Sequence, residues 1–160
     1  MRSNLYHYLK LALIVLSAGH FSVQAEARKI ILGVKPGLHF DPKVLHVLPG
    51  EEVELAFDNS DLMMHNFVLV EPGARMEIVE AANALGEKGP ALHYVPDSAK
   101  VLASTPVVMP KKKSTVRFKA PGKEGKYPYV CTFPGHGFLM HGTLFVAKTE
   151  PKELTAGPAK

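Results

Sequence analysis

The sequence predicts an all-β protein, an antiparallel β-sandwich with one small helix inserted between two of its strands. Three observations support this fold class. Short apolar or alternating segments recur along the chain, with turn residues between them. The 160 residues include 13 glycines and 13 prolines, which favour many turns over long helices. A single stretch, residues 76–85, has a helical pattern, and the chain length suits one domain with its own core.

The individual elements follow from local patterns along the chain. Residues 52–57 and 114–119 alternate polar and apolar side chains with the period of two of a half-buried strand, whereas residues 66–70 are apolar throughout. Pro106 cannot donate a backbone hydrogen bond, so the short strands on either side of it are expected at a sheet edge. The remaining predicted strands are apolar runs at 29–34, 44–48, 101–102, 107–109, 127–132 and 142–146.

The N-terminal residues have the pattern of a secretory signal peptide. Arg2 and Lys10 are basic, residues 11–18 are apolar, and Val23-Gln24-Ala25 ends in the small-x-small style of a signal-peptidase site. The apolar run is far below the ~20 residues that span a bilayer. We therefore expect a protein that is periplasmic or otherwise exported, with no membrane span after cleavage; a short membrane anchor that is not cleaved is the alternative. The predicted organisation is a signal peptide at 1–25, one domain at 26–148 and a polar C-terminal tail at 149–160.

The charge gives little support to a nucleic-acid partner. The whole chain has a formal charge of +4, but removal of residues 1–25 deletes Arg2 and Lys10 and no acidic residue, which leaves +2. A balance this close to zero does not provide the basic surface that binding to a phosphate backbone requires. We expect no nucleic-acid partner.

The candidate chemistry lies in one loop near the C-terminus. Cys131, the only cysteine, is followed by His136 and Met140 at positions +5 and +9, in a Gly- and Pro-rich segment between two predicted strands. His65 opens the apolar strand far upstream, and the loops at one end of a sandwich can bring it to the others. A thiolate, two imidazoles and a thioether are the donors of a blue-copper electron-transfer site, with two His and one Cys in a plane and a weak axial Met. Zinc fits this set poorly, because Met is not a usual zinc ligand.

Two segments carry a resemblance to a known family. Residues 131–140 (CTFPGHGFLM) and 63–68 (MMHNFV) resemble the azurin and auracyanin branch of the cupredoxins, a family of Greek-key β-sandwiches that bind one type 1 copper ion. The resemblance implies His65, Cys131 and His136 as strong copper ligands and Met140 as the axial ligand. It also implies a weak contact from the backbone carbonyl of Met64, at a position where azurins usually have Gly.

The resemblance also implies roles for residues next to the ligands. The Asn66 side chain would tie the two ligand loops together through Thr132, and the Phe133 backbone N–H would donate to the Cys131 sulfur and tune the potential. Azurins have a disulfide remote from the metal, which a chain with one cysteine lacks. His141, directly after the axial Met, is interpreted as a surface residue.

The expected function is transfer of one electron by Cu(II)/Cu(I) cycling, without an enzymatic reaction. The resemblance implies that His136 passes the electron through an apolar surface patch to partners such as c-type cytochromes or a periplasmic oxidoreductase. The candidate patch residues are Pro36, Leu38, Met63, Pro134, Phe138 and Leu139.

Two other functions compete with electron transfer. A copper oxidase or nitrite reductase would need a second, His-rich site, and the other histidines after residue 25 form no paired-His motif; a Cys131–His136 nucleophile and base would leave Met140 unexplained. Periplasmic copper carriage or storage is the alternative from another class. Proteins of that kind tend to have exposed Met- and His-rich tracts, of which this chain has only Met63-Met64.

Overall fold

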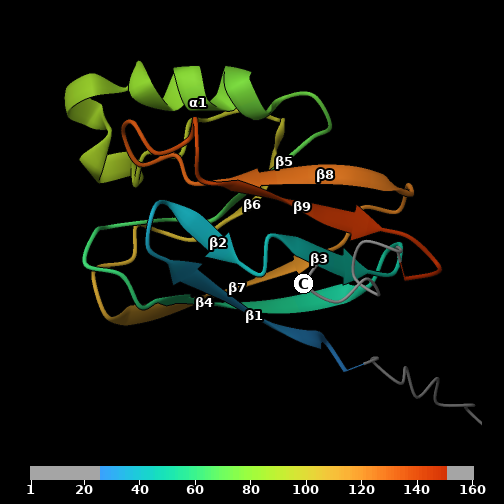
Figure 1. Ribbon diagram of the computed structural model, residues 1–160. Helices are drawn as coiled ribbons and strands as arrows, with labels where there is room; N and C mark the ends of the chain where they lie inside the picture. Colours follow the sequence, from blue (N-terminus) through green and yellow to red (C-terminus); the bar gives the residue numbers. More distant parts are fainter. Residues whose placement is uncertain (1–25, 151–160) are drawn as a thin grey trace, which may run out of the picture.

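Residues 26–150, which the computed structural model describes, form two β-sheets packed face to face with one α-helix on the outside (Figure 1). The predicted signal peptide at 1–25 and residues 151–160 of the predicted tail lie outside the described residues. Within the described part of the chain, no helix is long and apolar enough to cross a membrane. The fold is the predicted β-sandwich with a small helix.

The first sheet has the strand order β2-β1-β4-β7. The strand β4 shows why its sequence forms a half-buried strand: buried and partly exposed residues alternate from Val53 to Asn59, so that Leu55 and Phe57 enter the core. The strands of this sheet are β1 (Arg28–Lys35), β2 (His39–Asp41), β4 (Glu52–Asn59) and β7 (Lys112–Lys119).

The second sheet has the order β3-β9-β8-β5-β6 and provides most of the metal-site scaffold. Its strand β5 is buried at every residue because it is covered on both faces, by the other sheet and by the helix. The strands are β3 (Val44–Val47), β5 (Val68–Val70), β6 (Val101–Ser104), β8 (Gly125–Val130) and β9 (His141–Val146).

Strand direction differs from the prediction in one respect. Both sheets are mixed, because β1 runs parallel to β4 and β3 runs parallel to β9, while the other pairs are antiparallel. The chain moves to the other sheet between β1 and β4, and β3 and β9 lie far apart in sequence, so neither pair is joined by a hairpin. An alternation of polar and apolar residues indicates that a segment is a strand, but it does not indicate whether the neighbouring strand is parallel or antiparallel.

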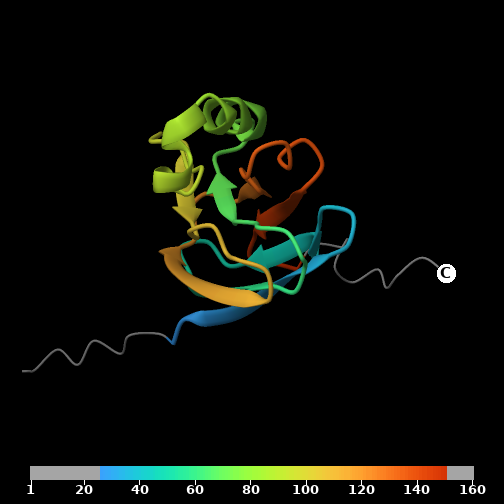
Figure 2. The same cartoon turned by 90° about the vertical axis from the view of Figure 1, so that its left-hand side faces the viewer.

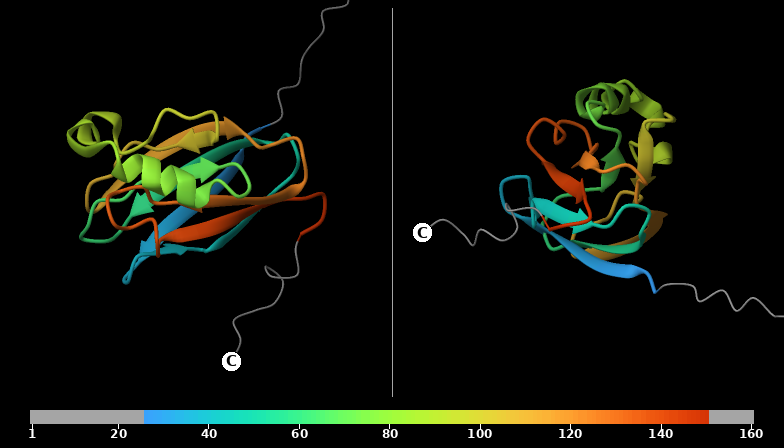
Figure 3. Two further views of the ribbon diagram at one scale, coloured as in Figure 1. Left: turned by 90° about the horizontal axis from the view of Figure 1, so that it is seen from above. Right: turned by 90° about the vertical axis from the view of Figure 1, so that its right-hand side faces the viewer.

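Two hydrophobic cores hold the layers together. The main core lies between the sheets and includes Leu32, Phe40 and Tyr129, all at most 1% exposed. The second core lies between α1 (Arg75–Asn83) and the outer face of the second sheet, where Ile78 and Val79 pack near β5 and β8. Figure 2 and Figure 3 show the same arrangement from other sides, with α1 over the second sheet and away from the first.

Local structure differs from the prediction at two further places. The strand β2 was not predicted, because its three residues follow a turn in which Gly37 has φ 87° and Leu38 has φ 61°. The predicted strand at 107–109 is reduced to a single bridge between Val108 and His65. The strand β6 does lie at a sheet edge, as Pro106 predicts.

Candidate metal centre

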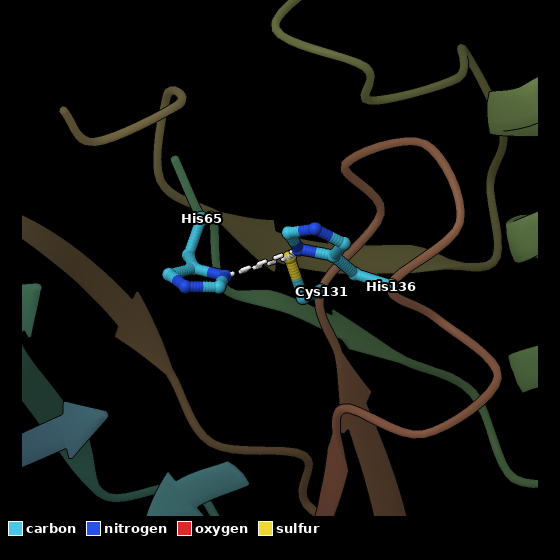
Figure 4. A group of neighbouring side chains, drawn as sticks. All are labelled: His65, Cys131 and His136. Carbon is cyan, nitrogen blue, oxygen red and sulfur yellow. Dashed lines mark hydrogen bonds between the residues drawn. The ribbon is translucent and has the colours of Figure 1, made fainter. Parts of the chain in front are cut away.

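Three donor side chains from two distant segments meet at one end of the sandwich. Cys131 follows the last residue of β8, His136 lies in the loop after it, and His65 precedes β5. Figure 4 shows the three side chains pointing toward one another, His65 from one side and Cys131 and His136 from the other. All three are buried, with His136 the most exposed at 9%. They form a cluster that could hold a metal ion.

The distances between the donor atoms define the size of the site. The Cys131 Sγ atom lies 3.8 Å from His65 Nδ1 and 3.7 Å from His136 Nδ1, and the two Nδ1 atoms are 3.2 Å apart. A point equidistant from the corners of this triangle is about 2.1 Å from each of them, close to the lengths of ordinary metal–nitrogen and metal–sulfur bonds. The triangle therefore has the dimensions of a trigonal metal site.

The loop from Cys131 to Met140 is closed by its own backbone. The Cys131 N–H donates to the Met140 carbonyl at 3.0 Å, and the Met140 N–H donates to the His136 carbonyl at 2.8 Å. Met140 is fully buried in the same core as Cys131. The hydrogen bonds hold the residue expected to be the axial ligand next to two members of the triangle.

His65 is held from the opposite side of the site. Its backbone exchanges two hydrogen bonds with Val108, His65 N–H to Val108 O at 3.2 Å and Val108 N–H to His65 O at 2.7 Å. The buried Asn59 side chain donates to the same Val108 carbonyl at 2.9 Å. The segment around Val108 therefore supports His65, a role that its sequence pattern did not reveal.

Two hydrogen bonds join the segments that provide the ligands. The Asn66 Nδ2 atom donates to Thr132 Oγ1 at 2.8 Å, and the Thr132 backbone N–H donates back to Asn66 Oδ1 at 2.8 Å. Both side chains are buried, and a buried amide whose oxygen and nitrogen are both hydrogen-bonded has one favourable orientation. This contact fixes the distance between the segment after His65 and the loop after Cys131.

Asp61 contacts His65 and was not predicted as part of the site. Its Oδ2 atom lies 3.1 Å from His65 Nε2, and because a carboxylate can only accept, Nε2 carries the proton and Nδ1 presents its lone pair toward Cys131. A carboxylate that accepts from the outer nitrogen of a ligand histidine is a common feature of metal sites. The available signal was an acidic residue four positions before the histidine, among the turn residues between two predicted strands.

Burial and local charge set the protonation of the donors. Burial raises the pKa of the Cys131 thiol to about 11, although the backbone N–H groups of Asn66 and Phe133 at the sulfur oppose this effect. Burial lowers the pKa of His65, against the pull of Asp61, and burial together with the charge of His65 lowers that of His136. Both imidazoles are therefore neutral at pH 7, the form that binds metals.

The residue types fit copper. One sulfur and two imidazole nitrogens in a triangle, with a buried thioether beside them, are the donors of a type 1 copper site. His141 does not belong to the donor cluster: it is an exposed residue of β9. Met64 is half-buried next to His65, and the contact from its carbonyl stays a prediction.

Comparisons with known proteins place the chain among copper proteins. The profile of the family "Copper binding proteins, plastocyanin/azurin family" matches residues 29–147. Auracyanin-A of Chloroflexus aurantiacus is 40% identical over 111 residues, which cover 68% of this chain and 67% of that protein. Azurin of Pseudomonas aeruginosa is 37% identical over 86 residues, which cover 52% of this chain and 57% of that protein.

A solved structure supports the same conclusion. The structure of auracyanin A, described as a "blue" copper protein from a green thermophilic photosynthetic bacterium, matches with a TM-score of 0.70 and 37% identity over 76% of this chain and 100% of that one. A two-sheet sandwich that closes a thiolate and two imidazoles into a triangle at one end defines a cupredoxin with a type 1 copper site. The chain belongs to the plastocyanin/azurin family of copper-binding proteins.

Proposed function

We propose that this protein is a blue copper electron carrier of the periplasm, with His65, Cys131 and His136 as strong ligands and Met140 as the axial ligand. The observation that supports it most is the donor triangle, whose size and composition suit copper. Bound copper supplies a one-electron Cu(II)/Cu(I) couple. Its partners are redox proteins such as c-type cytochromes or a periplasmic oxidoreductase, and no substrate bonds to the metal.

The chain's own residues serve this function by holding the donors in place. The hydrogen bonds of Asn66, Thr132 and Val108 run between protein groups and do not depend on the oxidation state of a bound ion. Donors that cannot move far keep one geometry for both oxidation states, and little rearrangement then accompanies the transfer of an electron. The site is also shielded, because Cys131 is buried and water does not reach its sulfur.

An apolar surface beside His136 is proposed as the place where partners dock. Among the residues that follow Cys131, Phe138 is 54% and Leu139 is 62% exposed, and Met63, next to the His65 segment, is 42% exposed. Leu62, at 77% exposed, joins this set although the sequence did not single it out. A small apolar surface suits brief encounters, which have interfaces below about 1,200 Å².

A visible spectrum tests the electron-carrier proposal. The Cu(II)-loaded protein should be intensely blue and give an EPR signal with narrow copper hyperfine splitting; ascorbate should remove both and reoxidation should restore them. A colourless Cu(I) protein that resists oxidation would instead support copper carriage or storage.

The variant Cys131→Ser tests the ligand assignment. Since the blue band arises from the bond between copper and the thiolate, we expect the variant to lose it, whether or not copper still binds to His65 and His136. Thr132→Ser is a suitable control, because it keeps the hydroxyl that accepts from Asn66. A Cys131→Ser protein that stays blue would contradict the assignment.

A further inference from the structure

A second group of soft donors lines a pocket outside the donor triangle. The pocket has a volume of about 480 Å³, and Met64, Met109 and His93 are among the residues that line it. Its other lining side chains are Pro90, Tyr94, Val107 and Phe133. No carboxylate and no lysine or arginine is among them, so the lining has no charged oxygen ligand for a hard cation and no positive charge that would repel a soft one.

The register of the bridge at His65 explains why the two methionines share this pocket. His65 and Val108 exchange both of their backbone hydrogen bonds, which makes them a hydrogen-bonded antiparallel pair. The residues that flank such a pair, Met64 and Met109, are then opposite each other as a non-hydrogen-bonded pair, in which side chains come closest. Val107, on the other side of Val108, also lines the pocket.

His93 lines the same pocket from another segment of the chain. The backbone carbonyl of His93 accepts a hydrogen bond from Asn66 Nδ2 at 2.9 Å, which holds this segment close to the residues around His65. His93 has φ 51° and Tyr94 has φ 56°, so the chain turns sharply there after the short helix η2 (Pro90–Leu92). His93 and Met109, which is 55% exposed, are both accessible from solvent.

The pocket adjoins the metal centre without being part of it. Met64 lines the pocket, whereas the Nδ1 atom of His65 lies 3.8 Å from the Cys131 sulfur. The Phe133 ring separates the two sites: its centroid is 5.0 Å from that of His136, and it also lines the pocket. The two donor groups therefore share a wall and a backbone segment but no donor atom.

We propose that Met64, Met109 and His93 form a second metal site, one that takes Cu(I) from solvent. Thioethers and an imidazole are neutral, soft donors, and three of them suit the low coordination number and single charge of Cu(I) better than they suit Cu(II) or Zn(II). The site is independent of the electron-carrier proposal, since the chain could hold a second copper ion whichever function the first one serves.

Titration of the fully reduced protein with Cu(I) tests the site. Protein that carries one Cu(I) ion in the donor triangle and 13C-labelled methionine methyl groups receives a further equivalent of Cu(I), as its acetonitrile complex, without oxygen. We expect two Cu(I) ions per chain in competition with a chromophoric Cu(I) chelator. The second ion should shift the methyl resonances of Met64 and Met109 and leave that of Met63 in place.

Matched variants separate this site from general binding by methionine. Met109→Leu and His93→Gln each remove one of the three ligands, so each variant should bind only one Cu(I) ion under the conditions in which the wild type binds two. Met63→Leu, which changes the neighbouring exposed methionine, should still bind two. The blue band of Cu(II)-loaded Met109→Leu verifies that this variant is folded and that its first site is intact.

The outcomes that overturn the proposal are specific. Wild-type protein that binds a single Cu(I) ion would refute the second site, as would a second ion that moves the Met63 resonance alone. A Met109→Leu protein that binds two ions as tightly as wild type would show that the second ion lies elsewhere. If Cu(II)-loaded wild-type protein showed no blue band, that result would count against the electron-carrier proposal and not against the second site.

Discussion

His65 illustrates how single residues determine the metal centre. Its backbone is paired with Val108, its Nε2–H donates to Asp61, and its Nδ1 atom faces Cys131. The ring is fully buried, so it has no freedom to exchange these contacts for water. The backbone pairing holds the residue in place, the contact with Asp61 selects Nε2 as the protonated nitrogen, and the lone pair of Nδ1 is left for a metal ion.

Replacement of Asp61 should weaken the site and raise its potential. A carboxylate beside His65 stabilises the more highly charged Cu(II) more than it stabilises Cu(I), and it fixes the ring. We expect Asp61→Ala to bind Cu(II) about tenfold more weakly while its affinity for Cu(I) stays the same. A tenfold lower affinity for Cu(II) relative to Cu(I) raises the reduction potential by about 59 mV.

Asp61→Asn separates the two effects. Its amide oxygen can still accept from Nε2, so the variant should keep the EPR signature of the wild type while its potential rises. The exposed carboxyl group of Asp97 offers a control, in which Asp97→Asn should change neither quantity. Unchanged potentials in both Asp61 variants would show that this carboxylate does not act on the metal.

Copper binding should become tighter as pH rises. The pKa of the Cys131 thiol is raised to about 11, so the group is protonated at neutral pH and must lose one proton to bind copper. Below that pKa the apparent affinity should increase about tenfold per pH unit between about pH 7 and pH 9. The lowered pKa values of His65 and His136 mean that these rings add to the slope only in more acidic solution.

Chelator competition at several pH values measures this slope, and release of one proton per copper ion in weakly buffered solution verifies it. A flat profile between pH 7 and pH 9 would mean that the thiol is already ionised in the metal-free protein.

Among the elements, the helix α1 supports the ligand loop as well as covering the sheet. The Arg75 guanidinium donates to the Gly137 carbonyl at 2.9 Å, and Val79 lies directly against Gly137. A Cβ atom at Gly137 would be 2.5 Å from Val79 Cγ2 and 3.0 Å from the Cys131 carbonyl oxygen. The loop can approach the helix this closely only because residue 137 has no side chain.

Gly137→Ala should therefore disturb both stability and the metal site. The added methyl group must push the loop away from α1, which we expect to cost about 1–3 kcal/mol in the free energy of unfolding. Since the same loop carries His136, the blue band and EPR parameters should change as well. Denaturant unfolding and the visible spectrum measure the two effects.

A second glycine provides the control for this substitution. Gly122 has no atom within 4 Å of an added Cβ, so Gly122→Ala should change little in either measurement. Equal behaviour of the two variants would contradict the proposed role of the contact with α1.

The elements also show how far the sequence could predict the structure. Alternation identified β4 and β7, and turn residues separated the strands, because these signals are local. The parallel pairing of β1 with β4 and of β3 with β9 depends on contacts between distant segments, and no local pattern encodes it. The ligand spacing at Cys131, His136 and Met140 was equally local and easily recognised.

The parts of the site that escaped prediction are non-local or chemically unremarkable. Val108 supports His65 through its backbone, and a backbone contact does not require a particular type of side chain. Arg75 contacts the loop from a helix more than 60 residues away in the sequence. Asp61 was visible in sequence but is one of several acidic turn residues. Only the fold shows which of them meets a histidine.

At the scale of the whole molecule, two of the exposed apolar residues of the sandwich lie in the same loop as a ligand of the metal centre. Phe138 and Leu139 follow His136 within three residues, so a protein that contacts them comes close to a metal ligand. The outer face of the first sheet offers a contrast in Ile31, which is 74% exposed and lies on β1.

A charge in the proposed docking surface should slow electron exchange. Leu139→Glu places a carboxylate that must lose water when a partner docks, and we expect the second-order rate with a c-type cytochrome to fall on the order of tenfold. Stopped-flow mixing at high salt, which screens long-range charge effects, measures the rate. Ile31→Glu adds the same charge at the first sheet and should leave the rate close to that of the wild type. Equal slowing by both substitutions would argue against a docking surface at Leu139.

The hydrogen bonds that hold His65, Cys131 and His136 have a consequence for metal competition in the cell. Because protein groups fix the donors, the same triangle is presented to every divalent ion that reaches it, and among the expected ligands only the Met140 thioether disfavours Zn(II). Copper binds more tightly by the general order of affinities, but an excess of zinc in the compartment can offset that advantage. A zinc-filled molecule would be colourless and unable to accept an electron. Which metal occupies the protein then depends on supply, and the active fraction of the molecules becomes a measure of copper availability.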